Sequence, residues 1–203
     1  MELILIDGNN VLFRSYYTTA YRGVIMTNYT GFPTNALYGF INMMNKIIKE
    51  EHPTYIMVAF DKGKTFRHDK YDDYKAGRQA MPDELKEQFP KAKEVLDAMG
   101  IKHFEIENYE ADDIIGTLAK RVDEEDEFIA TIVSSDKDLL QLVSDKTTVH
   151  LTKKGMTDLE SYTPQYFYEK YQKKLFRNLF YFKRYFILFF TRSKCCRRSN
   201  YIT

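Results

Sequence analysis

Cysteine is missing from the first 171 residues of this 203-residue chain, whose two cysteines are Cys195 and Cys196. Residues 1–171 therefore cannot form a disulfide scaffold, and they suit a reducing compartment. No uninterrupted apolar run reaches the roughly 18 residues that cross a bilayer. The chain begins with Met-Glu-Leu-Ile-Leu-Ile-Asp, which lacks the basic segment of a signal peptide. We expect a cytoplasmic protein that does not associate with membranes.

Acidic residues are missing from residues 172–203, which carry 9 Lys and Arg and 6 of the 15 Phe. Of the 30 basic and 29 acidic residues in the chain, residues 1–171 therefore hold 21 and 29, a net charge of −8. All 9 Gly and all 5 Pro also precede residue 172. The near-neutral total of +1 describes neither part. We predict one domain at 1–171 and an aberrant basic, Phe-rich tail at 172–203.

The tail has three interpretations. A frameshifted or mis-joined gene end accounts for the loss of Gly, Pro and acids, and we favour it. A basic helix on a nucleic acid or membrane surface is the second, because Phe176, Phe180 and the Lys183-Arg184 pair have partial helical spacing. A zinc or redox site at Cys195-Cys196 is the third, and it lacks the usual ligand spacing.

Short apolar segments alternate with amphipathic ones along residues 1–171. Strands are predicted at 2–6, 55–60, 102–106 and 128–133, with a hairpin at 147–151 and 156–162. Helices are predicted at 10–20, 34–49, 83–98 (kinked or broken at Pro90), 110–121 and 138–143, with another starting at Thr163-Pro164. This alternation indicates an α/β domain with a mostly parallel central sheet flanked by helices.

Carboxylates follow three predicted strands and begin one predicted helix. Because parallel sheets place their sites at the carboxyl ends of strands, we expect these side chains at one edge of the sheet. They are Asp7, Asp61, Glu110, Asp112, Asp113, Asp136 and Asp138. Packed together, they would repel one another, and their pKa values would rise unless a cation neutralised them. Oxygen ligands without His or Cys favour Mg²⁺, with Mn²⁺ as a substitute.

Such a site has a clear chemical use. Two divalent ions about 4 Å apart activate a water and stabilise both oxygens of a phosphodiester during in-line displacement. A single Asp at a strand end is commonly a turn or cap residue, but repetition at several strand ends favours a site. Simpler acidic sites fit less well. The Asp7-Gly8-Asn9 sequence lacks the acid pair of a phosphoaspartate receiver and the Asp-x-Asp of a dehalogenase-type phosphatase.

Residues 62–78 are basic and aromatic, with a net charge of +3. Cations that neutralise phosphates and aromatic rings that stack on bases are the combination found on single-stranded nucleic acid. A solvated surface loop is the alternative. Because the segment follows Asp61 directly, we interpret it as a gate for a nucleic-acid substrate, assisted by Arg14 and Tyr16, with Tyr17 in the core. The expected contacts within it are Lys64, Arg67, His68, Lys70, Tyr74, Lys75 and Arg78.

Longer motifs occur in the order of a known family. They include Ile-Asp-Gly-Asn-Asn-Val-Leu-Phe-Arg-Ser-Tyr-Tyr (6–17), Thr-Phe-Arg-His (65–68), Tyr-Lys-Ala-Gly-Arg-Gln (74–79), Tyr-Glu-Ala-Asp-Asp-Ile-Ile-Gly (109–116) and Ser-Asp-Lys-Asp-Leu-Leu-Gln-Leu (135–142). With these motifs, residues 1–171 resemble the 5′→3′ exonuclease (flap endonuclease) domain at the N-terminus of bacterial DNA polymerase I, or a stand-alone homologue of it.

The resemblance implies a resolvase-like or PIN-like fold and a Mg²⁺-dependent phosphodiesterase that uses two ions. Its implied substrates are DNA 5′ flaps, nicks and RNA primers in replication and repair. It also implies a monomer that associates with the nucleoid. The seven carboxylates match the family's metal ligands. Tyr74, Lys75 and Arg78 match residues that contact the scissile phosphate and the 5′ strand.

The resemblance stops after Tyr-Glu-Lys-Tyr (168–171). The family continues with a Gly-Asp-x-Ser-Asp-Asn motif, which adds two metal-ligating aspartates, and with a helix–hairpin–helix element that grips the duplex. Neither occurs in this sequence. Two hypotheses follow: an active structure-specific nuclease, or a non-catalytic or weakly active metal- and DNA-binding fragment of DNA polymerase I.

Overall fold

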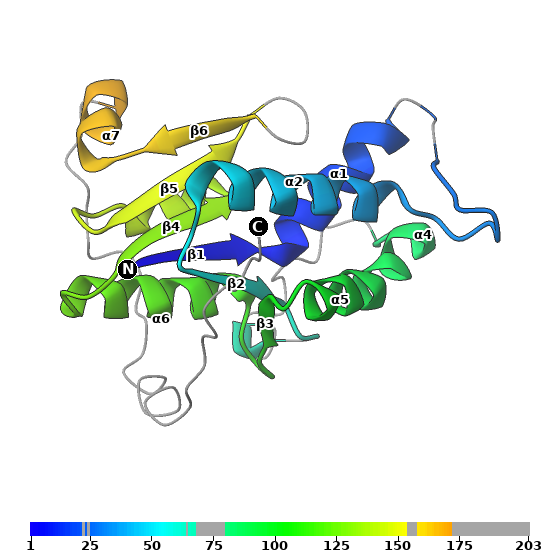
Figure 1. Cartoon of the computed structure of the whole chain (residues 1–203), viewed down its shortest axis with the longest axis horizontal. Coiled ribbons are helices and arrows are strands. Elements are labelled where there is room, and N and C mark those ends of the chain that lie inside the picture. The colour runs from blue at the N-terminus through cyan, green and yellow to red at the C-terminus, as the bar shows by residue number, and fades with distance from the viewer. Residues whose placement is uncertain (22, 24, 64, 68–79, 154–157, 172–203) are drawn as a thin grey trace.

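A six-stranded sheet forms the centre of the protein, with its strands in the order β3-β2-β1-β4-β5-β6 (Figure 1). The structure, a computed structural model, describes residues 1–21, 23, 25–63, 65–67, 80–153 and 158–171. The strands are β1 (Glu2–Asp7), β2 (Tyr55–Phe60), β3 (Lys102–Glu105), β4 (Ile129–Ser134), β5 (Thr147–Thr152) and β6 (Leu159–Tyr162). The helices are α1 (Gly8–Ala20), α2 (Asn35–Glu51), α4 (Asp83–Lys86), α5 (Gln88–Ala98), α6 (Ala111–Glu124), the 3₁₀ helix η1 (Lys137–Leu142) and α7 (Pro164–Tyr171).

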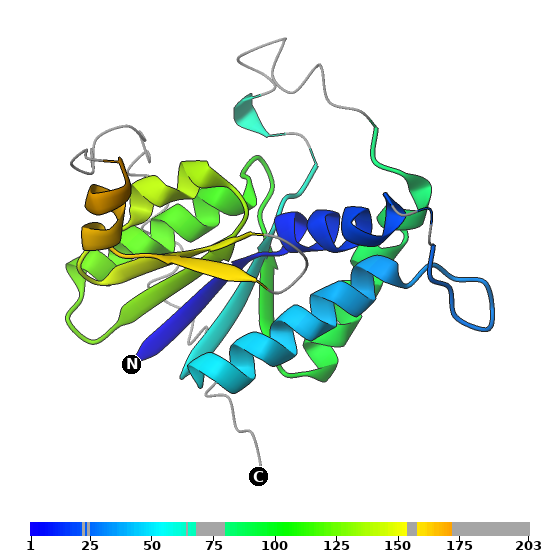
Figure 2. The same ribbon diagram turned by 90° about the horizontal axis from the view of Figure 1, so that it is seen from above.

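Helices cover both faces of the sheet, because alternate residues of a strand point to opposite sides. In β1, Ile4 and Ile6 join the core beneath α1, α2 and α5, whereas Leu3 and Leu5 join the core beneath α6 and η1. Figure 2 shows these two helical layers on either side of the sheet. All neighbouring strands run parallel except β5 and β6. The predicted α/β class with a mostly parallel, helix-flanked sheet is confirmed.

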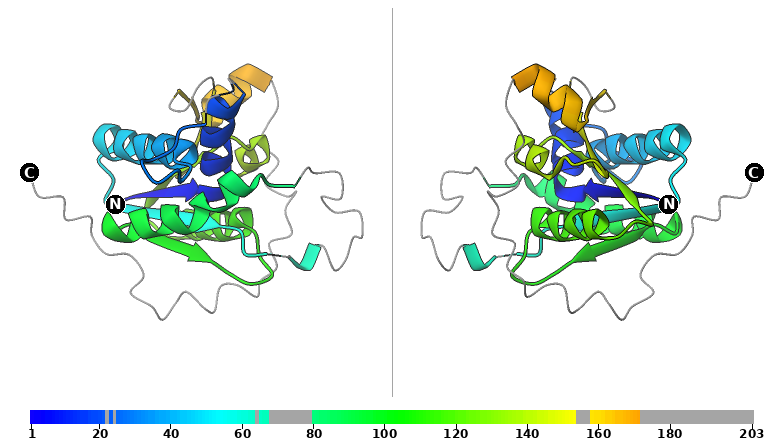
Figure 3. Two further views of the ribbon diagram at one scale, coloured as in Figure 1. Left: turned by 90° about the vertical axis from the view of Figure 1, so that its right-hand side faces the viewer. Right: turned by 90° about the vertical axis from the view of Figure 1, so that its left-hand side faces the viewer.

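The middle of the sheet contains a topological switch point. β1 pairs with β2 on one side and with β4 on the other, in the registers Asp7↔Ala59 and Ile6↔Val133. The connections therefore leave β1 and β4 in opposite directions, which opens the edge at the carboxyl ends of these strands. The left view of Figure 3 faces this edge, where β1 ends and α1 begins.

One predicted helix is broken at a different residue from the expected one. The 83–98 segment divides at Glu87, between α4 and α5, and Pro90 lies in the first turn of α5, where a missing N–H costs nothing. The break turns the side chain of Gln88 inwards. Its Oε1 accepts hydrogen bonds from the N–H groups of Ala36 (2.9 Å) and Leu37 (3.0 Å) in the first turn of α2. A buried amide thus joins the two helices.

The predicted hairpin at the far edge is confirmed, with Val149 of β5 opposite Tyr162 of β6 in an antiparallel pair. Residues 154–157 between its two strands and the 172–203 tail lie outside the described residues. The predicted 138–143 helix is the 3₁₀ helix η1. Among the residues that the structure describes, no helix has both the length and the apolar character needed to cross a bilayer.

Gly8 connects β1 to α1 at a point where nothing larger fits. A Cβ at this position would lie 2.4 Å from Cε1 of the Phe60 ring, which is itself fully buried. We predict that Gly8→Ala lowers the free energy of unfolding by about 1–3 kcal/mol, because the buried ring has to move. Chemical denaturation measures this loss. In a Phe60→Leu background the loss should be smaller, and an equal loss there would refute the steric explanation.

Candidate functional site

Asp7 is the central side chain at the open edge of the sheet. It is the last residue of β1 and also the N-cap of α1, where its Oδ1 accepts a hydrogen bond from the N–H of Asn10 (2.9 Å). Its Oδ2 accepts a hydrogen bond from Oγ of Ser134 at the end of β4 (3.0 Å). Only 5 % of Asp7 is exposed. Two neighbouring strands and one helix therefore fix the position of this carboxylate.

Two asparagines after Asp7 connect the neighbouring strand ends. Oδ1 of Asn9 accepts a hydrogen bond from the N–H of Asp61, just beyond β2 (3.0 Å). Oδ1 of Asn10 accepts hydrogen bonds from the N–H (2.8 Å) and Oγ (2.5 Å) of Ser135, just beyond β4. The sequence analysis missed these residues because they carry no charge. The available signal was a pair of amides directly after a strand that ends at a switch point.

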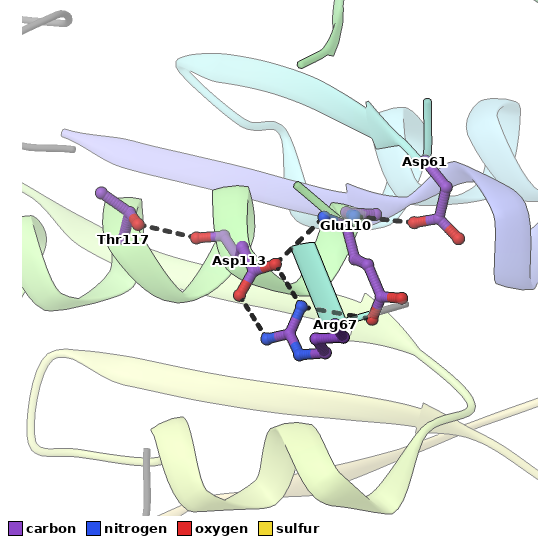
Figure 4. A network of polar contacts seen from close by, with 6 residues as sticks. Asp61, Arg67, Glu110, Asp113 and Thr117 are labelled. Atoms are coloured by element: carbon purple, nitrogen blue, oxygen red, sulfur yellow. Dashed lines mark hydrogen bonds and ion pairs between the residues drawn. The ribbon is translucent and has the colours of Figure 1, made fainter. Parts of the chain in front are cut away.

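The first turn of α6 is held against the end of β2. The N–H of Ala111 donates a hydrogen bond to Oδ1 of Asp61 (2.7 Å), and the N–H of Glu110 donates one to Oδ2 of Asp113 (3.0 Å). Figure 4 shows these contacts together with Arg67, whose two terminal nitrogens donate to the two oxygens of Asp113, each at 2.7 Å. Arg67 also lies 3.6 Å from Oε2 of Glu110.

Five of the seven predicted carboxylates share one electrostatic environment. Burial is the main cause that raises the pKa of Asp7 to about 7, and the like charges of Asp61 and Asp136 raise it further. The hydrogen bonds to Asp7 from Asn10 and Ser134 act in the opposite direction. Burial, followed by the charges of Asp7, Asp136, Asp61 and Glu110, raises the pKa of Asp112 to about 8. These five side chains therefore compete for protons or cations at one edge.

The other two predicted carboxylates are placed differently. Asp113 is paired with Arg67, as described above. Asp138 is exposed, and its N–H donates a hydrogen bond to Oδ1 of Asp136 (2.8 Å). Within the described ranges of residues 1–171, no three His, Cys, Asp or Glu side chains form a group that would by itself hold a metal ion. The donor chemistry nevertheless fits Mg²⁺ or Mn²⁺, because the buried oxygens with raised pKa values gain from neutralisation.

Few of the predicted nucleic-acid contacts fall in the described residues. Lys64, His68, Lys70, Tyr74, Lys75 and Arg78 lie outside them. Tyr16 is buried with 5 % exposed, whereas Tyr17 is partly exposed, so the expected order of these two tyrosines is reversed. The helical phase of α1 decides this, because its buried face carries Val11, Leu12 and Tyr16.

Arg14 lies beside the site on α1. A pocket of about 360 Å³ opens there between α1 and the residue after β4. Its walls are Asn10, Phe13, Arg14, Tyr17, Thr18, Tyr21 and Ser135. Partial burial lowers the pKa of the Arg14 guanidinium. The pocket combines aromatic rings with a cation next to the carboxylates.

Comparison with known proteins identifies the domain. Residues 2–172 match the family described as the 5'-3' exonuclease, N-terminal resolvase-like domain. The chain belongs to this family. It is 52% identical over 171 residues to DNA polymerase I of Geobacillus stearothermophilus, an overlap of 84% of this chain and 19% of that protein. It is 42% identical over 170 residues to a 5'-3' exonuclease of Bacillus subtilis, covering 83% of this chain and 57% of that protein.

This 5'-3' exonuclease domain also has relatives among solved structures. The T5 D15 protein co-crystallised with metal ions superposes with a TM-score of 0.59 at 23% identity, over 85% of this chain and 60% of that one. Flap endonuclease-1 from Methanococcus jannaschii superposes with a TM-score of 0.54 at 22% identity, over 85% and 60%. These superpositions support the fold. The chain spans about a fifth of the DNA polymerase I relatives that it matches.

The raised pKa of Asp7 predicts how the stability of the metal-free domain depends on pH. Its folded value of about 7 exceeds its ordinary value of 3.8, so its contribution to stability is complete below about pH 4 and is lost as the pH rises through 7. In EDTA, the free energy of unfolding should fall by a few kcal/mol between about pH 5 and pH 8. Urea denaturation across this range measures the change.

The control for this pH dependence uses two substitutions. Asp7→Asn removes one of two titrating groups and should make the decrease shallower, leaving the part due to Asp112, whereas Asp145→Asn at an exposed bend should leave it unchanged. A decrease in Asp7→Asn as steep as in the wild-type protein would contradict the assignment.

Proposed function

We propose that this domain is a Mg²⁺-dependent 5′→3′ exonuclease and flap endonuclease that hydrolyses phosphodiesters in DNA and in RNA primers during replication and repair. The observation that carries the proposal is the group of five carboxylates at the switch point, two of them with raised pKa values. Structural proteins gain nothing from repulsion of this kind, whereas a site that binds cations depends on it. Membership of the exonuclease family supports the same activity.

The residues proposed to hold the metal are the five that share one environment: Asp7, Asp61, Glu110, Asp112 and Asp136. When bound, divalent ions supply an activated water and neutralise charge on the phosphate, and the proposed ions are two Mg²⁺. Mn²⁺ prefers similar ligands and should substitute. The T5 D15 flap endonuclease, whose fold is similar, was crystallised with DNA and metal ions.

The protein itself would contribute position and charge. The hydrogen bonds from Ser134 and Asn10 keep the oxygens of Asp7 in fixed directions, and the bond from Ala111 does so for Asp61. A preorganised carboxylate site loses little entropy when it takes up a cation. Arg14, in the adjacent pocket, is the described cation best placed to attract a phosphate.

The basic and aromatic residues 62–78 would bind the 5′ strand of the substrate. Tyr74, Lys75 and Arg78 are the proposed contacts to the scissile phosphate and the strand, as the family motif implies. Lysine and arginine neutralise phosphates, and a tyrosine ring stacks on a base. A DNA 5′ flap, a nick or a primer end is therefore the proposed partner, bound by a monomer.

The second function is a domain that binds metal and DNA but does not cleave. It follows from the Gly-Asp-x-Ser-Asp-Asn motif, whose two further aspartates do not occur in this sequence. Cleavage and binding assays on the same sample separate the two functions.

Metal binding should be visible without DNA. Mg²⁺ at about 10 mM should raise the melting temperature of the wild-type protein, because a ligand that binds only the folded state stabilises it. Asp112→Asn should lose most of this increase, whereas Asp145→Asn should keep it. Calorimetry at pH 8 in the presence of EDTA and of excess Mg²⁺ gives both values. An equal increase in all three proteins would show that the carboxylates do not hold the ion.

Cleavage is tested with a fluorescent 5′-flap DNA, with the purified 203-residue chain and Mg²⁺. We expect cleavage near the flap junction, no product in EDTA, and a rate at least ~100-fold lower for Asp7→Asn. The same Asp7→Asn variant, purified identically, also guards against a contaminating nuclease. Binding of the flap in Mg²⁺ without cleavage would support the second function, and neither binding nor cleavage would refute both.

A further inference from the structure

The Arg67–Asp113 ion pair is a bidentate contact that is largely enclosed by the fold. Its side chains are 20% and 12% exposed, and two parallel hydrogen bonds of 2.7 Å join the guanidinium to both carboxylate oxygens. Figure 4 shows the pair between the first turn of α6 and the residues that follow β2. From the sequence, Arg67 was expected to contact DNA and Asp113 to bind metal.

We propose that Asp113 is an anchor for Arg67 and not a metal ligand, and that Arg67 is a positioning residue for Glu110. The proposal rests on the proposed function, because it states which acidic residues form the metal site. The pair would fasten the start of the basic residues 62–78 to α6, and it would hold the first turn of that helix at the edge of the sheet.

The hydrogen bonds of Asp113 support the role of anchor. Its two oxygens accept three hydrogen bonds, two from Arg67 and one from the N–H of Glu110. A cation bound to Asp113 would have to replace a guanidinium in a bidentate pair, whereas Arg67 contacts Glu110 only at 3.6 Å. Asp112 differs, because its electrostatic neighbours are the carboxylates of the site. Adjacent helical residues point about 100° apart, so the two acids have separate surroundings.

Residues next to Arg67 attach to the same part of the fold. Arg67 lies over the ring of Phe66 at 4.7 Å, and that ring packs edge-on against Tyr109 with 5.9 Å between centroids. The N–H of Phe66 donates a hydrogen bond to the carbonyl of Asn108 (3.2 Å). Residues 65–67 therefore lie along the loop that leads into α6. The Arg67–Asp113 ion pair extends this contact as far as Glu110.

The alternative is that Asp113 is a metal ligand and that Arg67 pairs with it only while no metal ion is bound. The two hypotheses predict opposite changes for Arg67→Lys, which keeps the charge but loses the bidentate fork. If Arg67 only occupies Asp113, the weaker pair should release the carboxylate, and Mn²⁺ should bind more tightly. If the pair is an anchor, Mn²⁺ should bind up to about 10-fold more weakly, because Glu110 loses its support.

The experiment measures Mn²⁺ affinity by electron paramagnetic resonance and melting temperature in EDTA for the full chain. Arg67→Gln and Asp113→Asn should each lower the melting temperature by about 5 °C or more. The double variant should melt close to the less stable single variant, because the first substitution already breaks the pair. The matched control is Arg121→Lys in the exposed Arg121–Glu125 pair of the same helix, which should change neither quantity.

Tighter Mn²⁺ binding in Arg67→Lys, or additive losses in the double variant, would overturn the proposal. Asp112→Asn serves as the reference for a true ligand, with a loss of Mn²⁺ affinity larger than that of any Arg67 variant. The melting temperatures test the anchor even if the wild-type protein neither binds Mn²⁺ nor cleaves DNA. Failure of the proposed function is therefore distinguishable from failure of the anchor.

Discussion

Repulsion among buried carboxylates is the constraint on which the rest of this structure depends. Five acids meet where β1, β2 and β4 end, and burial together with like charge raises the pKa values of Asp7 and Asp112. Uncompensated, such a group would destabilise the fold. The surrounding neutral donors, which include Ser134, Asn10 and the N–H of Ala111, direct hydrogen bonds at these oxygens. The residues that hold the carboxylates therefore belong to the same strands and helices that form the sheet.

The periodicity of the sequence predicted most of the fold. β2 occupies the predicted 55–60 segment, and β1 covers the predicted 2–6 segment with Asp7 added. The break at Glu87 was missed because Pro90 is the stronger local signal, whereas the buried hydrogen bonds of Gln88 join segments about fifty residues apart. Local sequence patterns do not predict hydrogen bonds between residues so far apart in the chain.

For the site, the charged residues at strand ends predicted where the carboxylates lie but not which residues they contact. Asp112 and Asp113 look equivalent in the sequence, and only the position of Arg67 distinguishes them. Tyr16 and Tyr17 look equivalent as well until the phase of α1 is known. The alternation of strands and helices predicts that acids at strand ends lie together. Which of two adjacent side chains faces the site depends on three-dimensional packing, which the sequence pattern does not give.

The buried amide of Gln88 has a consequence for the segment between β2 and α5. Arg67, near the start of this segment, attaches to α6 on one face of the sheet, and Gln88, just after it, attaches to α2 on the other. These two attachments hold the two ends of the segment on opposite faces of the sheet. Loss of either attachment would therefore release one end while the other stays in place.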